Sequence, residues 1–223
     1  MKKVLKFFII ICLIFFCIEL YGESIIVLPK PKYKGYVTLE ETLKERRSIR
    51  EFSEEPLTSQ EVSQLLWAMQ GITEKSGKRT APSAGALYPL EIYLLCGNVK
   101  NIAAGVYKYN PFKHHILKIK EGDKREEISY ASLGQPWVKN ASVNFIIAAV
   151  YERTTRKYGE KGIRYVHIEV GHAAQNLLLQ ATALRIGAVP VGAFDENEVR
   201  KVIGLKNNEQ PLYIISVGRI KYN

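Results

Sequence analysis

The chain has 223 residues, of which 47% are hydrophobic and 24% charged, and it carries a formal net charge of +10. This length suffices for one domain with a sizeable core, and the composition excludes an intrinsically disordered chain. The charge does not indicate a nucleic-acid partner, because the lysines are scattered and no basic run interleaves with aromatic residues. We interpret it as a solvated basic surface.

Residues 1–22 have the pattern of a secretory signal peptide, with lysines ahead of an apolar block from Phe7 to Ile18 and the small residue Gly22 behind it. The block is short for a membrane-spanning helix, which needs about 20 residues. Counting from Val4 leaves an uncleaved anchor through residues 4–18 as the alternative, and we expect membrane contact only in that case. The sequence therefore predicts export to the periplasm or the extracellular space.

Residues 23–37 show no periodicity and contain two prolines and a glycine, so we expect an extended leader there and one domain over residues 38–223. Thr38 with Glu41, and Thr58 with Glu61, have the spacing of capping boxes, in which each side chain satisfies a backbone N–H left free at a helix start. They predict helices from 38 to about 47 and from 58 to 70. Gly71 suits a left-handed helix end.

The rest of the pattern predicts a mixture of helices and strands without steady alternation. In chain order we expect a strand at 90–96, a hairpin at 105–120, a helix at 123–133, a strand at 143–151, a long helix at 164–186 ended by Gly187, a helix from Asp195 to about 203 and a strand at 212–218. Strand 143–151 is apolar on both faces and should be central. The expected fold class is α+β, with a mixed central sheet flanked by helices.

Four polar residues lie at and just after the end of the first predicted helix: Arg46, Arg47, Ser48 and Arg50. A guanidinium group can donate two parallel hydrogen bonds to two oxygens of a phosphate, and a serine hydroxyl adds a neutral donor. Arg219, just after the last predicted strand, could converge on the same anion. The alternative is an exposed helix end whose cations meet the negative end of the helix dipole.

Two loops have the small residues that let backbone approach a flat ligand. Ala81 to Pro89 reads A-P-S-A-G-A-L-Y-P, with Ser83 as a donor, and it directly precedes a predicted strand. Pro190 and Gly192 shape a second turn, whose backbone N–H groups could face a ring nitrogen.

Two other kinds of site are not supported. The chain lacks G-x-S-x-G, so a nucleophile-elbow hydrolase has no basis in the sequence. His167 and His172 are five apart on the long predicted helix and cannot share a metal as an i, i+4 pair does. We expect no metal site.

Six motifs in order carry a resemblance: R-R-S-x-R, P-S-A-G-x-L-Y-P, K-Y-G, G-H-x-x-Q-N, P-x-G-A-F and a terminal V-G-R. Over residues 38–220 the chain resembles the FMN-dependent nitroreductase superfamily, and is most similar to its SagB-type azoline dehydrogenase branch. The Ala81–Pro89 loop lacks the asparagine and the Q-P-W sequence that usually follow the serine of this loop in reductases of nitroaromatics. The resemblance implies a nitroreductase-like fold with FMN at the interface of a homodimer.

The resemblance also implies the cofactor-binding residues. Arg46, Arg47, Ser48, Arg50 and Arg219 match the segments that bind the FMN phosphate and ribityl chain. The loop against the flavin ring, usually contributed by the other subunit, matches Pro82, Ser83, Ala84 and Gly85, and the segment over the ring matches Pro190, Val191, Gly192 and Ala193. Gln135 is a further candidate for the polar edge of the ring.

Lys157 and Tyr158 match the catalytic Lys-Tyr pair of the azoline dehydrogenases, where one of them could remove a substrate proton as hydride leaves for flavin N5. The implied activity is an FMN-dependent oxidoreductase acting on a small-molecule or peptide substrate, with NADH or NADPH as a candidate electron donor. The alternative is an exported flavin-binding or ligand-binding protein that has kept the fold without turnover.

Overall fold

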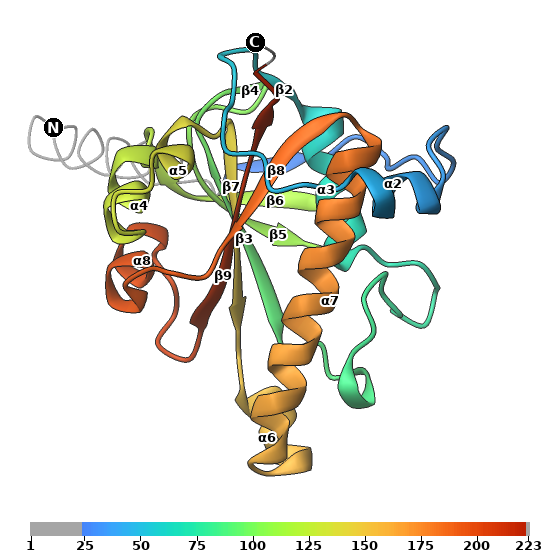
Figure 1. Cartoon of the computed structure of the whole chain (residues 1–223). Coiled ribbons are helices and arrows are strands. Elements are labelled where there is room, and N and C mark those ends of the chain that lie inside the picture. The colour runs from blue at the N-terminus through green and yellow to red at the C-terminus, as the bar shows by residue number, and fades with distance from the viewer. Residues whose placement is uncertain (1–23, 222–223) are drawn as a thin grey trace, which may run out of the picture.

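The computed structural model describes residues 24–221, which form one seven-stranded sheet with helices on both sides (Figure 1). In sheet order the strands are β1 (Ile25–Val27), β6 (His115–Glu121), β5 (Gly105–Asn110), β3 (Leu90–Cys96), β7 (Val143–Ala149), β9 (Gln210–Arg219) and β8 (Ile186–Val191). Every pairing in this sheet is antiparallel. The α+β class is confirmed, and parallel pairing in the described part is confined to the short ladder of β2 (Leu57–Thr58) and β4 (Val99–Lys100).

Helices cover both faces of the sheet. They are α2 (Leu39–Glu45), α3 (Ser59–Gln70), α4 (Arg125–Ala131), α5 (Pro136–Asn140), α6 (Glu152–Tyr158), α7 (Lys161–Ala183) and α8 (Glu196–Ile203), with a 3-10 turn at Ala84–Ala86. One core lies between the sheet and α3 with α7, and a second lies between the sheet and α4, α5 and α8. In Figure 1, α7 runs along one side of the sheet, away from α4, α5 and α8.

Strand β7 serves both cores. Successive side chains of a strand point to opposite faces, and accordingly Phe145 packs in the α3/α7 core while Ile146 packs in the α4/α5/α8 core. All seven residues of β7 are buried. The prediction of a central strand is confirmed, although the strand ends at Ala149 rather than Tyr151.

The three helix starts predicted from capping residues are confirmed, while the helices expected from 164 and 123 begin at Lys161 and Arg125. Thr38 and Thr58 each form a complete capping box, and the Asp195 carboxylate accepts a hydrogen bond from the backbone N of Glu198 at 2.9 Å. Two predicted helix ends are wrong. Gly71 is extended (φ −64°) rather than left-handed, and α7 ends at Ala183 because Arg185 takes the left-handed conformation (φ 58°) that turns the chain into β8.

Strand β8 replaces the turn that we expected around Pro190, and Gly187 lies inside this strand. Strand β8 is the last in the sheet order and pairs there only with β9. An edge strand tolerates proline because the missing N–H need not serve a second neighbour. The sequence pattern also missed α5 and α6, both of which are short helices.

The described residues of the leader belong to the domain. Strand β1 pairs with β6, and the side-chain amide of Gln64 exchanges hydrogen bonds with the backbone of Lys32 at 2.8 and 3.0 Å. The predicted signal peptide, residues 1–22, lies outside the described residues. None of the helices within residues 24–221 is long and apolar enough to cross a membrane.

The ring of Phe52 packs against the sheet and so holds the segment that follows α2 in place. Gly187 and Gly218 are paired across β8 and β9 and leave room for this ring. A Cβ added at Gly218 would lie 2.8 Å from Cγ of Phe52, and one at Gly187 would lie 3.1 Å from Cε1. Glycine at both positions therefore lets residues 46–52 lie against the strands.

Gly218→Ala should lower the free energy of unfolding by about 1 to 3 kcal/mol, the usual cost of overpacking. The added methyl meets the root of the Phe52 ring, which cannot swing away as the tip of a flexible side chain can. Urea titration measures the loss. Gly35→Ala is the matched control because a Cβ there meets nothing within 4 Å. Equal stability of the two variants would contradict the packing argument.

Candidate functional site

The arginine segment lies against the ends of β8 and β9. The backbone N of Ile49 donates to the carbonyl of Ala188 at 3.0 Å, and that of Ser53 donates to the carbonyl of Arg219 at 3.0 Å. Phe52 forms an isolated bridge with Ile220. The two parts of the chain that we predicted to converge, Arg46–Arg50 and Arg219, are therefore neighbours through their backbones.

Arg46, Arg47 and Arg50 form no ion pair with any carboxylate of residues 24–221. Arg47 donates through Nη1 to the carbonyls of Lys44 and Arg46, at 2.9 and 2.8 Å. Its side chain thus satisfies backbone acceptors at the C-terminal end of α2. The guanidinium of Arg50 lies 5.2 Å from the centre of the Trp137 ring. Three cations without a carboxylate partner are suited to an anionic ligand.

Arg219 differs, because carboxylates already surround its guanidinium. Its Nη1 and Nη2 contact the Glu61 carboxylate at 2.8 and 3.0 Å, and Nε lies 3.4 Å from Oε1 of Glu55. Glu61 also caps α3 by accepting from the backbone N of Thr58 at 2.7 Å. Arg219 lies where we predicted it, but its charge is compensated within the chain.

Gln135 connects α5 to the segment that follows β8. Its Nε2 donates to the carbonyl of Ala193 at 3.0 Å and to that of Ser132 at 2.8 Å. Pro190 and Val191 end β8, while Gly192 and Ala193 are exposed. Together with the neighbouring arginines, these residues form one surface. We call it the arginine half: Arg46–Arg50, Gln135, Pro190–Ala193 and Arg219.

The other predicted residues, Pro82–Gly85 with Lys157 and Tyr158, gather elsewhere and form the loop half. Gly85 has a left-handed φ of 62°, and a Cβ there would lie 2.7 Å from Oη of Tyr158 and 3.0 Å from Nζ of Lys157. A side chain at this left-handed position would be strained, and its Cβ would displace the ends of both side chains. The Tyr158 ring packs edge-on against that of Tyr165. The structure therefore brings the predicted catalytic pair against the predicted flavin loop.

The two halves lie toward opposite ends of α7 (Figure 1). Close to its C-terminal end, Arg185 pairs with Glu45 of α2 at 2.6 Å, directly before the arginine segment. At its other end are α6, with Lys157 and Tyr158, and Glu169, which interacts with Ser83. From Glu169 to Ala183, the last residue of α7, the helix rises by about 21 Å. One chain therefore does not join the two halves into one site.

Glu169 is a member of the loop half that the sequence interpretation missed. The residue is 2% exposed, and its Oε1 has no hydrogen-bond partner among the described residues. Burial raises the pKa of its carboxyl to about 7, while the Ser83 hydroxyl and the Arg79 charge oppose this shift. One feature of the sequence could have identified Glu169: it is a charged residue on the same face of the long helix as the apolar Val166 and Val170.

Glu169→Gln should remove a pH dependence of stability. Because the raised pKa lets the folded state keep a proton that the unfolded state releases, the free energy of unfolding should fall as pH rises from about 4.5 to 7. We expect a loss on the order of 2 kcal/mol, which the variant lacks. Urea titrations at about pH 5 and 8 test this, with the exposed Glu160→Gln as control. An unchanged pH slope in Glu169→Gln would refute the assignment.

Residues 43–219 match the Nitroreductase family. Two similar proteins bear the name "Putative nitroreductase". The one from Methanocaldococcus jannaschii is 49% identical over 183 residues, which cover 82% of this chain and 91% of the relative. The other, a crystal structure from Ralstonia eutropha, is 28% identical, with a TM-score of 0.79 and coverage of 90% of this chain and 91% of that one.

The relatives also include proteins named for the processing of trifolitoxin and of microcin B17. The microcin B17-processing protein McbC of Escherichia coli is 27% identical over 156 residues, 65% of this chain and 56% of that protein. A solved E. coli microcin synthetase McbBCD complex shares the fold, with a TM-score of 0.70 at 22% identity and coverage of 92% of this chain and 80% of that one. The resemblance derived from the motifs is confirmed, and the chain belongs to the nitroreductase family.

Proposed function

We propose that the protein is an FMN-dependent oxidoreductase of the SagB-type dehydrogenase kind, with an active site shared between two copies of the chain. The observation that carries this proposal is the separation of the arginine half from the loop half along α7. Each half provides some of the groups that the reaction needs. The arginine half has cations without carboxylate partners among the described residues, and the loop half has a Lys-Tyr pair beside a loop of small residues. A two-fold axis would set each loop half against the partner's arginine half, giving two equal sites.

The residues of both halves fit FMN. Arg46, Arg47 and Arg50 offer guanidinium donors that no described carboxylate neutralises, which suits a phosphate. Gly192 is exposed, and the nearest atom to a Cβ placed there is 3.9 Å away, so a flat ring could approach this backbone. In the loop half, Pro82 and Gly85 are likewise exposed and carry little or no side chain.

Exposed apolar side chains support a partner copy. On α7, Ile163 and Ile168 are 45% and 50% exposed, and Gly171, one turn further on, has open space beside it. On α2, Leu39 and Leu43 are 60% and 55% exposed. Burying such residues against a second copy would remove apolar surface from water.

When bound, FMN would supply hydride transfer at N5. Arg46, Arg47 and Arg50 would bind its phosphate, and Gln135 would hold the Ala193 carbonyl and so orient the backbone over the ring. Lys157 Nζ or Tyr158 Oη would take a proton from a carbon acid on the substrate. NADH or NADPH as electron donor, a peptide or small-molecule substrate, and export through residues 1–22 belong to the same proposal.

Arg46→Ala and Arg50→Ala should each weaken FMN binding by about 10- to 150-fold, because each removes a charge-assisted contact. Titration of purified protein with FMN, followed by quenching of flavin fluorescence, measures the affinity. Lys201→Ala is the control, since it removes an exposed cation of α8 that pairs with Glu198. Wild-type affinity in both arginine variants would exclude the arginine half from the cofactor site.

Mixed dimers test whether the site is shared. Gly85→Val should damage the loop half, because its side chain would collide with Tyr158 and Lys157. Each variant alone should bind FMN weakly. Equal mixtures of Arg50→Ala and Gly85→Val chains should regain tight binding at about one quarter of the sites, because half of the dimers are mixed and each has one intact site. The shared site would be refuted if the mixture did not regain tight FMN binding and light scattering gave the mass of a monomer.

Lys157→Ala and Tyr158→Phe should leave FMN affinity unchanged but slow oxidation of a carbon-acid substrate such as an azoline by about 10²- to 10⁴-fold, the usual effect of losing a general base. Flavin reduction by NADH or NADPH needs no proton abstraction and should be spared. The ratio of the two rates is the measurement, with Arg156→Ala, an exposed neighbour on α6, as control.

Three outcomes would contradict the catalytic assignment. A proportional fall in both rates would mean that the Lys-Tyr pair only shapes the pocket. A wild-type protein that reduces quinones or nitroaromatics yet ignores azolines would favour an ordinary reductase. Bound FMN that no donor reduces would favour the binding protein without turnover.

A further inference from the structure

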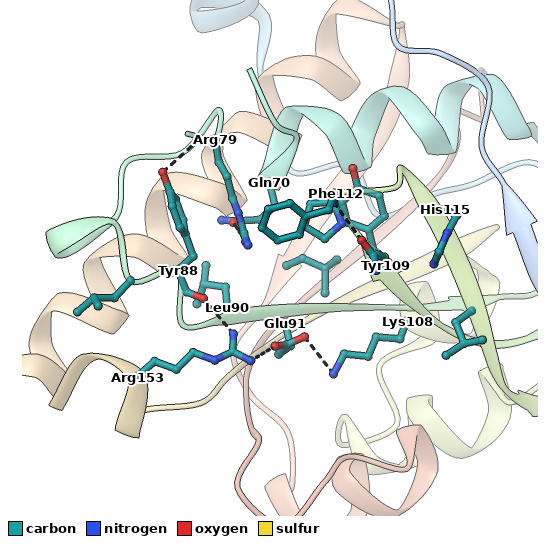
Figure 2. A pocket seen from close by; sticks show the side chains of 15 residues that line it. Gln70, Arg79, Tyr88, Leu90, Glu91, Lys108, Tyr109, Phe112, His115 and Arg153 are labelled. Atoms are coloured by element: carbon teal, nitrogen blue, oxygen red, sulfur yellow. Dashed lines mark hydrogen bonds and ion pairs between the residues drawn. The ribbon is translucent and has the colours of Figure 1, made fainter. Parts of the chain in front are cut away.

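A second cavity lies between β3, the β5–β6 hairpin and the Arg79–Tyr88 segment (Figure 2). Its volume is about 510 Å³, within the range that holds a small organic ligand. None of the residues of the arginine half or the loop half lines it. The cavity therefore needs an explanation of its own.

Two residues that line this cavity, Gln70 and Arg79, each have a buried N–H donor without an acceptor within residues 24–221. Gln70 is 1% exposed, and its amide oxygen accepts a hydrogen bond from Arg79 Nη1 at 2.7 Å. This bond fixes the orientation of the amide, so Nε2 is the free end, and it has no partner in the described part of the chain. Nε of Arg79 is likewise buried without a partner. An acceptor ligand would satisfy both donors, which are otherwise costly to bury.

The guanidinium of Arg79 is held in place by rings rather than by a carboxylate. It lies 4.4 Å from the centre of the Tyr88 ring and 5.7 Å from that of Phe112. Residues 24–221 provide no carboxylate within 4.0 Å of it, and burial lowers the pKa of this group from its ordinary value. A planar cation fixed on aromatic faces keeps its N–H edge available for a carboxylate.

The neighbouring charges reinforce this preference for an anion. Glu91 also lines the cavity, but Lys108 contacts it at 3.0 Å and Arg153 forms a second ion pair with it. Figure 2 shows both cations reaching this one carboxylate. Because Glu209 also pairs with Lys108, at 2.6 Å, Arg79 is the lining cation left without a carboxylate contact in the described part of the chain, while Leu87, Leu90 and Leu117 provide apolar wall.

We propose that this cavity binds a carboxylate carried on a small apolar or aromatic body, with Arg79 and Gln70 as the two donors. The source can be a free aromatic acid or the C-terminal carboxylate of a peptide, since both present the same group. The test of this site does not depend on the proposed flavin chemistry, although the cavity borders the loop half: the Arg79 charge acts on the carboxyl of Glu169, and the backbone N of Tyr88 donates to Oγ of Ser83.

Calorimetric titration of the purified full chain tests the proposal with benzoate and with N-acetyl-Ala-Ala-Phe, each against its uncharged amide. The carboxylates should bind, and the amides should bind at least about 10-fold more weakly. Preference for benzoate identifies the free acid as the source, and preference for the tripeptide identifies the peptide terminus. Both titrations are repeated with FMN, so failure of the flavin proposal leaves this result readable.

Two variants locate the site. Gln70→Glu keeps the size of the side chain and places a carboxylate on Arg79, so it should abolish binding of both probes while the protein stays folded by circular dichroism. Arg79→Gln should weaken binding by about 10- to 100-fold. Lys78→Ala, which removes an exposed cation of the same loop that pairs with Glu74, should bind normally.

Three results would overturn the proposal. They are no binding of either carboxylate up to about 10 mM, unchanged binding in Gln70→Glu, and inorganic phosphate binding as tightly as benzoate, which would indicate a general anion site without an apolar component.

Discussion

The length of α7 is the constraint on which the proposed function depends. A straight helix of 23 residues holds its two ends a fixed distance apart, because each residue adds a constant rise. The helix is buried along Val166, Val170, Ala173 and Leu177, so it cannot bend to bring its ends together without opening the core. The arginine half and the loop half therefore stay apart in one chain. The shared site proposed above follows from this separation, since a ligand that needs both halves would bridge two copies.

Compensation of individual charges, rather than the net charge of +10, indicates where anions bind. Lys108, Arg153 and Arg219 are cations, but Glu91, Glu209, Glu55 and Glu61 already neutralise them. Among residues 24–221, Arg156, Arg164 and Arg200 also have no carboxylate partner. At the two candidate sites, the guanidinium groups without such partners are those of the arginine segment and of Arg79. These groups separate into two places with different surroundings: an exposed surface suited to a phosphate, and an aromatic cavity suited to a carboxylate.

Features decided by local sequence were predictable, and features decided by distant contacts were not. The capping boxes at Thr38 and Thr58 each depend on two residues that are three positions apart in the sequence, so these helix starts could be predicted correctly. Strand β8 contains residues typical of a turn and forms because β9 pairs with it. The site motifs are contiguous and were recognisable, whereas Glu169 and Gln70 act through partners from other segments. No local pattern reports that their polar atoms are buried.

The segment from Arg79 to Tyr88 links the loop half to the second cavity. Its middle, Pro82–Gly85, faces Lys157 and Tyr158, while Arg79 and Tyr88 at its ends line the second cavity. The backbone N of Tyr88 donates to Oγ of Ser83 at 2.9 Å, and Oη of Tyr88 accepts from the backbone N of Arg79 at 3.3 Å. These bonds tie the loop to the ring that stacks on Arg79. A ligand that holds this ring in the cavity would also act on the loop through these two hydrogen bonds.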